Sequence, residues 1–129
     1  MIDFTVAIDP VAKARAKVTR NGTFTPGKTA NYQKAIALHC PVDVQTGPLR
    51  VEIDLVLAIP RSWSKARKEQ AIIGKVRPTS RPDVDNYAKA VLDAIEGRAF
   101  TDDAQVVELF ARLFYDVDPS VHCRVEPLV

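Results

Sequence analysis

Five aspartates and one lysine that stand close together in the sequence are suited to metal-dependent chemistry. They are Asp83, Asp85, Lys89, Asp93, Asp102 and Asp103. Carboxylates that are forced together repel one another and disfavour the folded state unless a cation lies between them. Mg²⁺ prefers such oxygen ligands, whereas softer metals prefer cysteine or histidine. Carboxylate-held Mg²⁺ serves phosphoryl transfer, in which the ion polarises the phosphoryl oxygen and a lysine adds positive charge near the transition state.

The stretch 82–97 predicts the clearest helix of the chain. Its apolar residues recur at helical spacing, Asp83 or Asp85 can cap its start, and a glycine follows its last apolar residue. Within it, Asp85, Lys89 and Asp93 follow one another at intervals of four residues. At 3.6 residues per turn, these three side chains are expected to lie on one face.

The Asp102–Asp103 pair precedes a predicted strand over residues 105–115. The connection from the helix is short, so the strand is expected to fold back beside it and bring the pair to its carboxylates. Each piece also has a structural explanation: a helix cap, an Asp85–Lys89 ion pair or a turn. Taken singly, the pieces favour these explanations. Their joint occurrence after a basic region favours a shared site.

The charge of the chain is divided between its two parts. Residues 1–82 hold 14 Lys and Arg against 6 Asp and Glu, a net charge of +8, and residues 83–129 hold 4 against 10, a net charge of −6. Basic side chains neutralise a polyanion, and clustered carboxylates hold a hard cation. The +8 part argues against an acidic protein-interaction domain. A DNA-binding module without catalysis and a metal-dependent nuclease remain as alternatives.

The rest of the chain predicts one small α/β (α+β) domain over residues 1–129, with a mixed sheet of about four to five strands and two to three helices packed on it. Expected elements are a strand over residues 2–8, a hairpin turning at Asn21-Gly22, a helix from Thr29 to about Cys40, a strand over residues 49–57, a short helix capped by Ser62 or Ser64 and closed by Gly74, and a last strand over residues 121–126.

Several side chains outside the acidic cluster have structural interpretations. His39 has no metal-binding partner at helical spacing, so packing in or beside the core is expected. Trp63 is expected to pack under the short helix, with stacking on a nucleobase as the alternative. Cys40 and Cys123 lack the spacing of a zinc site, which favours two free, partly buried thiols in a reducing compartment. No apolar run approaches the roughly 20 residues that span a bilayer, and a cytoplasmic protein is expected.

The sequence resembles a known family in its acidic region. The matching residues are Arg81-Pro82-Asp83-Val84-Asp85-Asn86, Lys89-Ala90, Asp93-Ala94 and Asp102-Asp103-Ala104-Gln105-Val106-Val107. They resemble the RusA family of Holliday-junction resolvases, and Gly22-Thr23-Phe24-Thr25-Pro26 with Thr29 and Tyr32 resembles its phage-type branch. The resemblance covers nearly the whole chain, and it is most specific in residues 81–107.

The resemblance implies a homodimer that binds four-way DNA junctions and makes paired, Mg²⁺-dependent nicks that leave 5′-phosphates. Mn²⁺ is expected to substitute for Mg²⁺, and no membrane partner is expected. The resemblance implies that Asp83, Asp85 and Asp103 are catalytic metal ligands, that Lys89 is the catalytic lysine, and that Asp102 supports the site or shares it as a further metal ligand. It also implies two supporting residues, Asn86, which orients Asp83 or Asp85, and Asp93, which could anchor Lys89.

A set of basic side chains is expected to form a face that contacts DNA phosphates. The set is Lys13, Arg15, Lys17, Arg20, Lys28, Lys65, Arg67, Lys68, Lys75, Arg77 and Arg81. The loop over residues 9–15 departs from the usual Pro- and Arg-rich version of the family. This departure leaves open a nuclease of wider specificity for branched DNA.

Overall fold

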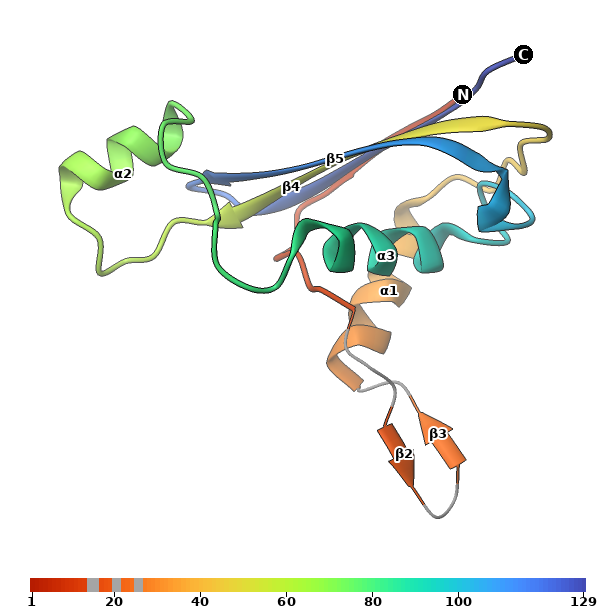
Figure 1. The fold of residues 1–129 in the computed structure, drawn as a ribbon, viewed down its shortest axis with the longest axis horizontal. Coiled ribbons are helices and arrows are strands. Elements are labelled where there is room, and N and C mark those ends of the chain that lie inside the picture. The colour runs from red at the N-terminus through yellow and green to blue at the C-terminus, as the bar shows by residue number, and fades with distance from the viewer. Residues whose placement is uncertain (14–16, 20–21, 25–26) are drawn as a thin grey trace.

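A four-stranded mixed sheet carries the fold (Figure 1). The computed structural model describes residues 1–13, 17–19, 22–24 and 27–129. The strands of the sheet are β1 (Ile2–Val6), β4 (Leu49–Ala58), β5 (Val106–Asp116) and β6 (Ser120–Pro127), in the order β1-β6-β4-β5. β4 and β5 are parallel, whereas β6 is antiparallel to both β1 and β4.

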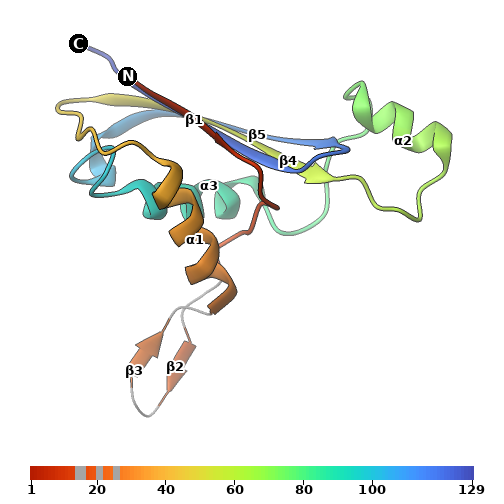
Figure 2. The ribbon, with the colours of Figure 1, turned by 180° about the vertical axis from the view of Figure 1, so that it is seen from behind.

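Two helices cover one face of this sheet, as Figures 1 and 2 show from opposite sides. They are α1 (Gly27–His39) and α3 (Val84–Ile95). The central strand β4 alternates along its length, so Leu49, Val51, Ile53 and Leu55 are fully buried. Facing them, α3 buries a broad apolar stripe that fixes its orientation on the sheet. The polar side of α3 is therefore held facing outward.

The parallel pair β4 and β5 requires a crossover, and this crossover contains the site. It passes through α2 (Lys65–Ile72), which stands near the end of β4 in Figure 1, and then through α3. A 3₁₀ turn, η1 (Asp103–Gln105), leads directly into β5. Because β4 and β5 begin side by side, with Leu49 opposite Val106, the residues before β5 are brought next to α3 as expected.

The predicted hairpin is confirmed in the backbone. β2 (Lys17–Thr19) and β3 (Gly22–Phe24) pair antiparallel, and Figures 1 and 2 show them projecting away from the sheet beyond α1. The turn residue Asn21 lies outside the described residues, as do Arg15 and Arg20.

Two expectations about α1 are wrong. The helix begins at Gly27, so Thr29 lies in its first turn, where its small side chain is buried, and is not the cap. His39 is exposed, with its ring Nδ1 2.8 Å from the Ala35 carbonyl oxygen. The buried stripe of the helix continues through Cys40, and this leaves His39 on the solvent side.

The expectations about α2 and the cysteines are confirmed. Ser64 caps the helix, its hydroxyl accepting a hydrogen bond from the Arg67 amide at 3.2 Å. Trp63 packs edge-on against Tyr115, with ring centroids 5.0 Å apart, and the Arg67 guanidinium lies 3.8 Å from the Trp63 ring centre. Both cysteines are free and buried. None of the helices in the described part of the chain has the length and apolarity to cross a membrane.

Candidate active site

The start of α3 places two carboxylates that have no visible structural task. Asp83 is the N-cap residue in extended conformation, yet its side chain makes no capping hydrogen bond. Asp85 follows in the first turn, and both residues are exposed. Asp83 lines an open pocket between the loop over residues 78–80 and Leu113 of β5. Within the described residues, no hydrogen bond or ion pair occupies the carboxylate of Asp83 or Asp85.

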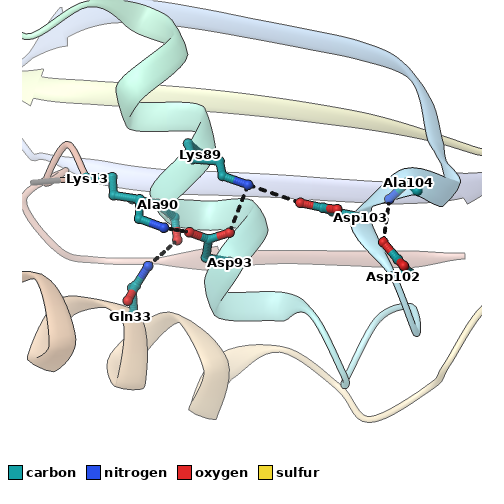
Figure 3. A network of polar contacts seen from close by, with 8 residues as sticks. All are labelled: Lys13, Gln33, Lys89, Ala90, Asp93, Asp102, Asp103 and Ala104. Carbon is teal, nitrogen blue, oxygen red and sulfur yellow. Dashed lines mark hydrogen bonds and ion pairs between the residues drawn. The ribbon is translucent and has the colours of Figure 1, made fainter. Parts of the chain in front are cut away.

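One turn further along α3, Lys89 joins the helix to the approach of β5 (Figure 3). Its Nζ lies 3.0 Å from Asp103 Oδ2 and 3.2 Å from Asp93 Oδ1. The expected alignment of Lys89 and Asp93 on one helix face is thus confirmed, and Asp103 meets them across the crossover. The partner of Lys89 is not Asp85, because the ammonium is held on the side of Asp93 and Asp103.

These contacts fix the charge state of the pair. The hydrogen bond from Lys89 to Asp103, followed by the one to Asp93, raises the pKa of the Lys89 ammonium. The same Lys89 contact lowers the pKa of the Asp103 carboxyl. Each shift favours the charged form of its group. Lys89 is therefore a cation at neutral pH, suited to stabilise negative charge and not to remove a proton.

A second lysine reaches the same cluster from the N-terminal loop. Lys13 Nζ donates to Asp93 Oδ2, while its backbone amide donates to the Asn86 carbonyl at 3.0 Å. Figure 3 shows Lys13 and Lys89 approaching Asp93 from different elements. The hydrogen bond that Asn86 accepts here uses its backbone carbonyl, and its side chain makes no hydrogen bond to Asp83 or Asp85 among the residues described. Asp93 therefore binds both lysines, whereas the sequence suggested only that it could anchor Lys89.

Asp102 and Asp103 have different tasks although they are neighbours. Asp102 caps η1, with Oδ1 accepting from the Ala104 amide at 2.9 Å. Gln105 completes a capping box, its Oε1 accepting from the Asp102 amide at 3.1 Å. Figure 3 shows the Asp102 carboxylate turned toward Ala104 and the Asp103 carboxylate turned toward Lys89. Asp102 thus supports the turn that presents Asp103.

A group of three carboxylates forms at the far end of this network. Ligand oxygens of Asp93, Glu96 and Asp103 all lie within 4.8 Å of one another. Glu96 was not predicted from the sequence, although its position three residues after Asp93 places it on the same side of the helix. In the described part of this chain, Asp83 and Asp85 do not join the group. Asp85 stands one turn before Lys89, roughly 6 Å along the helix axis.

The chain matches a known protein family over nearly its whole length. Residues 7–126 match the family model described as "Endodeoxyribonuclease RusA". The chain belongs to the RusA endodeoxyribonuclease family. A relative from Bacillus subtilis (strain 168), named "Uncharacterized protein YqaN", is 38% identical over 134 residues, which cover 96% of this chain and 94% of the relative. RusA proteins are endodeoxyribonucleases, so DNA is the substrate that the family implies for this chain.

The donor atoms at this RusA site fit a hard divalent cation. Asp83, Asp85 and Asp103 offer carboxylate oxygens, and the group of carboxylates around Asp93 likewise contains neither cysteine nor histidine. Oxygen-only donors suit Mg²⁺ and Mn²⁺. Asp93 and Asp103 already bind lysines, whereas within the described ranges no lysine binds Asp83 or Asp85.

The basic residues of this RusA chain are distributed over separate elements. Lys28, Lys65, Lys75 and Arg81 are exposed, and Lys68 is half-buried. Arg77 is partly engaged, because its Nε donates to the Leu113 carbonyl at 2.7 Å and its guanidinium lies 4.1 Å from the Phe114 ring centre. Arg15 and Arg20 fall outside the described residues, and so does the side chain of Lys17.

Proposed function

We propose that this protein is a Mg²⁺-dependent, structure-selective endonuclease that resolves four-way (Holliday) junctions. Paired symmetric nicks across the branch leave 5′-phosphates. The observation that supports the proposal is the 3.0 Å contact between Lys89 and Asp103, which joins α3 to the Asp102–Asp103 turn in a chain of the RusA family. If Asp102–Asp103 were only a turn, nothing would require Asp103 to meet Lys89 across a crossover.

Asp83, Asp85 and Asp103 are the residues proposed to hold the ion, with Mn²⁺ as a substitute for Mg²⁺. Asp83 and Asp85 support this choice because their oxygens carry no hydrogen bond or ion pair within the described residues. When bound, the ion polarises the scissile phosphoryl group and stabilises the charge on the departing oxygen. Asn86, an exposed residue that directly follows Asp85 in the first turn of α3, is proposed to orient Asp83 or Asp85.

Lys89 supplies the positive charge of the protein at the reacting phosphate. Its ammonium is held by Asp93 and Asp103 before DNA arrives, so little reorganisation is needed when negative charge develops. Asp102 keeps η1 folded and so keeps Asp103 at this position. These residues orient the reacting groups and neutralise negative charge, and Lys89 is not proposed to transfer a proton.

The basic set is proposed to hold the DNA on either side of the acidic site. Its described members include Lys28 in the first turn of α1 and Lys65 and Lys68 in α2, and Figure 1 shows α2 projecting at one end of the sheet. Phosphate contacts of this kind position the duplex arms without reading sequence. Binding is therefore expected to weaken steeply as salt is added.

A homodimer is proposed as the active assembly, working in the cytoplasm of a bacterial or phage-infected cell. Two subunits related by a two-fold axis place two acidic sites on opposite strands of a pseudo-symmetric junction. Sedimentation at micromolar concentration tests the assembly, and a monomer that makes paired nicks would contradict it.

The decisive experiment is a nicking assay on a synthetic four-way junction with Mg²⁺. Symmetric nicks that DNA ligase can seal are expected, whereas Ca²⁺ should support binding without cutting. A panel of flaps, forks and linear duplex runs in parallel. Equal cleavage of flaps and forks would replace the proposal with a nuclease of broader branched-DNA specificity. Binding without nicking in either Mg²⁺ or Mn²⁺ would leave a DNA-binding module.

A further inference from the structure

The N-terminal loop makes a contact with the active site that its basic character does not explain. Val11 and Ala12 pack against the core, so the loop is anchored just before Lys13. The backbone amide of Lys13 is then bound to the Asn86 carbonyl of α3. A lysine that served only DNA phosphates would be expected to extend into solvent. The Lys13 side chain instead turns back to Asp93, whose side chain is only 20% exposed.

Asp93 divides its two oxygens between two lysines. Oδ2 accepts from Lys13, and Oδ1 lies 3.2 Å from the Lys89 ammonium. Lys89 is in turn shared with Asp103 at 3.0 Å. Figure 3 shows the resulting chain of three contacts, which leads from Lys13 through Asp93 and Lys89 to Asp103.

This arrangement limits how strongly Asp93 can attract Lys89. The last torsion of an aspartate side chain is broad, so a carboxylate that loses one partner can rotate toward the other. Without Lys13, both oxygens of Asp93 become available to Lys89. The ammonium is then expected to move toward Asp93 and away from Asp103, and therefore away from the proposed position of the scissile phosphate.

We infer that Lys13 is a positioning residue for DNA cleavage, which holds one oxygen of Asp93 so that Lys89 stays shared with Asp103. The inference rests on the proposed function, because it assigns Lys13 a part in the same reaction. For Lys13 alone, the inference replaces the phosphate contact proposed above with an indirect effect on the rate of cleavage.

The test separates the rate of cleavage from the affinity for DNA. Lys13→Met removes the ammonium and keeps the apolar stem, and Lys34→Met on the exposed side of α1 is the matched control. We expect the single-turnover rate at saturating protein to fall about tenfold in Lys13→Met, with little change in junction Kd measured in Ca²⁺. Lys13→Arg should restore most of the rate, and Lys34→Met should match the wild type.

A double variant tests whether the effect passes through Asp93. If Lys13 acts only on that carboxylate, adding Lys13→Met to Asp93→Asn should not lower the rate further. Additive losses would overturn the inference. So would a weaker junction Kd with an unchanged rate, which would make Lys13 a phosphate contact.

A measurement without DNA keeps this inference distinct from the proposed function. In the metal-free protein, the NMR signal of the Lys89 ammonium should shift in Lys13→Met and remain in place in Lys34→Met. A wild-type protein that does not nick any substrate would refute the proposed function, whatever the NMR result. A wild type that nicks the junction, together with an unmoved Lys89 signal and an unchanged rate in Lys13→Met, would refute the inference alone.

Discussion

The two acidic helix starts of this protein use similar residues for different purposes. At η1, Asp102 caps the turn and Asp103 binds Lys89, so both carboxylates are engaged within the protein. At α3, Asp83 occupies the N-cap position without a capping bond, and Asp85 has no ion pair among the described residues. Asp102 and Asp103 thus already have protein partners, whereas the carboxylates of Asp83 and Asp85 have no hydrogen bond or ion pair among the described residues.

This difference decides between the structural and the functional explanation of each motif. A cap aspartate normally stabilises its helix through a hydrogen bond to a backbone amide. Asp83 makes no such bond, and both Asp83 and Asp85 are exposed. Their carboxylates therefore remain available to a bound cation. Each prediction below tests whether the two helix starts differ in this way.

The largest effect is expected from Asp83→Asn. The substitution keeps the size of the side chain and removes a charge that the proposed ion needs, so junction cleavage should fall by about a thousandfold or more. Junction binding should persist or strengthen, because a negative charge near the phosphates is lost. Single-turnover cleavage and Kd in Ca²⁺ measure the two effects. Asp118→Asn, in the turn between β5 and β6, is the control that should cleave normally, and cleavage at the wild-type rate by Asp83→Asn would refute the site assignment.

Lys89→Ala should have the next largest effect. Loss of a held cation beside the reacting phosphate is expected to lower the rate by about a hundredfold. The fold should persist, because the ion pairs of Lys89 are partly exposed and such pairs contribute about 1 kcal/mol or less. Cleavage assays and thermal unfolding measure both quantities. A fully active Lys89→Ala protein would remove the lysine from the reaction.

The positions of the acidic motifs could be predicted from the sequence because they depend on local periodicity. The spacing of Asp85, Lys89 and Asp93 sets their common face, and the short connection to β5 requires Asp103 to return to it. The start of α1 and the exposure of His39 could not be predicted in this way. Both depend on how far a helix extends before the core ends, which tertiary packing decides.

The Lys13–Asp93 contact was beyond prediction for a different reason. The two residues are 80 positions apart, and a basic loop carries no periodic signal that names its partner. The sharing of tasks between Asp102 and Asp103 was equally hidden, because a capping box and an ion pair are both compatible with an Asp-Asp-Ala-Gln sequence. The approach of Asp103 to Lys89 and Asp93 was therefore predictable, whereas the partner of each side chain and the place of Glu96 beside Asp93 were not.

Metal binding should distinguish the two sets of carboxylates near α3. An ion at about 100 times its Kd raises the free energy of unfolding by about 2.7 kcal/mol. We expect Asp85→Asn to lose this stabilisation and Glu96→Gln to keep it, as measured by thermal unfolding with and without Mg²⁺. The reverse result would place the ion in the group of Asp93, Glu96 and Asp103.

The smallest effects are expected on the free energy of unfolding when the two N-cap aspartates, Asp102 and Asp83, are each replaced by alanine. Asp102→Ala breaks a side-chain hydrogen bond at η1 and should lower the free energy of unfolding by about 1 kcal/mol. Asp83→Ala breaks none at α3, so only its charge near the helix start is lost, at about 0.5 kcal/mol or less. Urea unfolding without metal ions measures both values. Equal losses would mean that Asp83 stabilises α3 as much as Asp102 stabilises η1, which would contradict the proposed difference between the two helix starts.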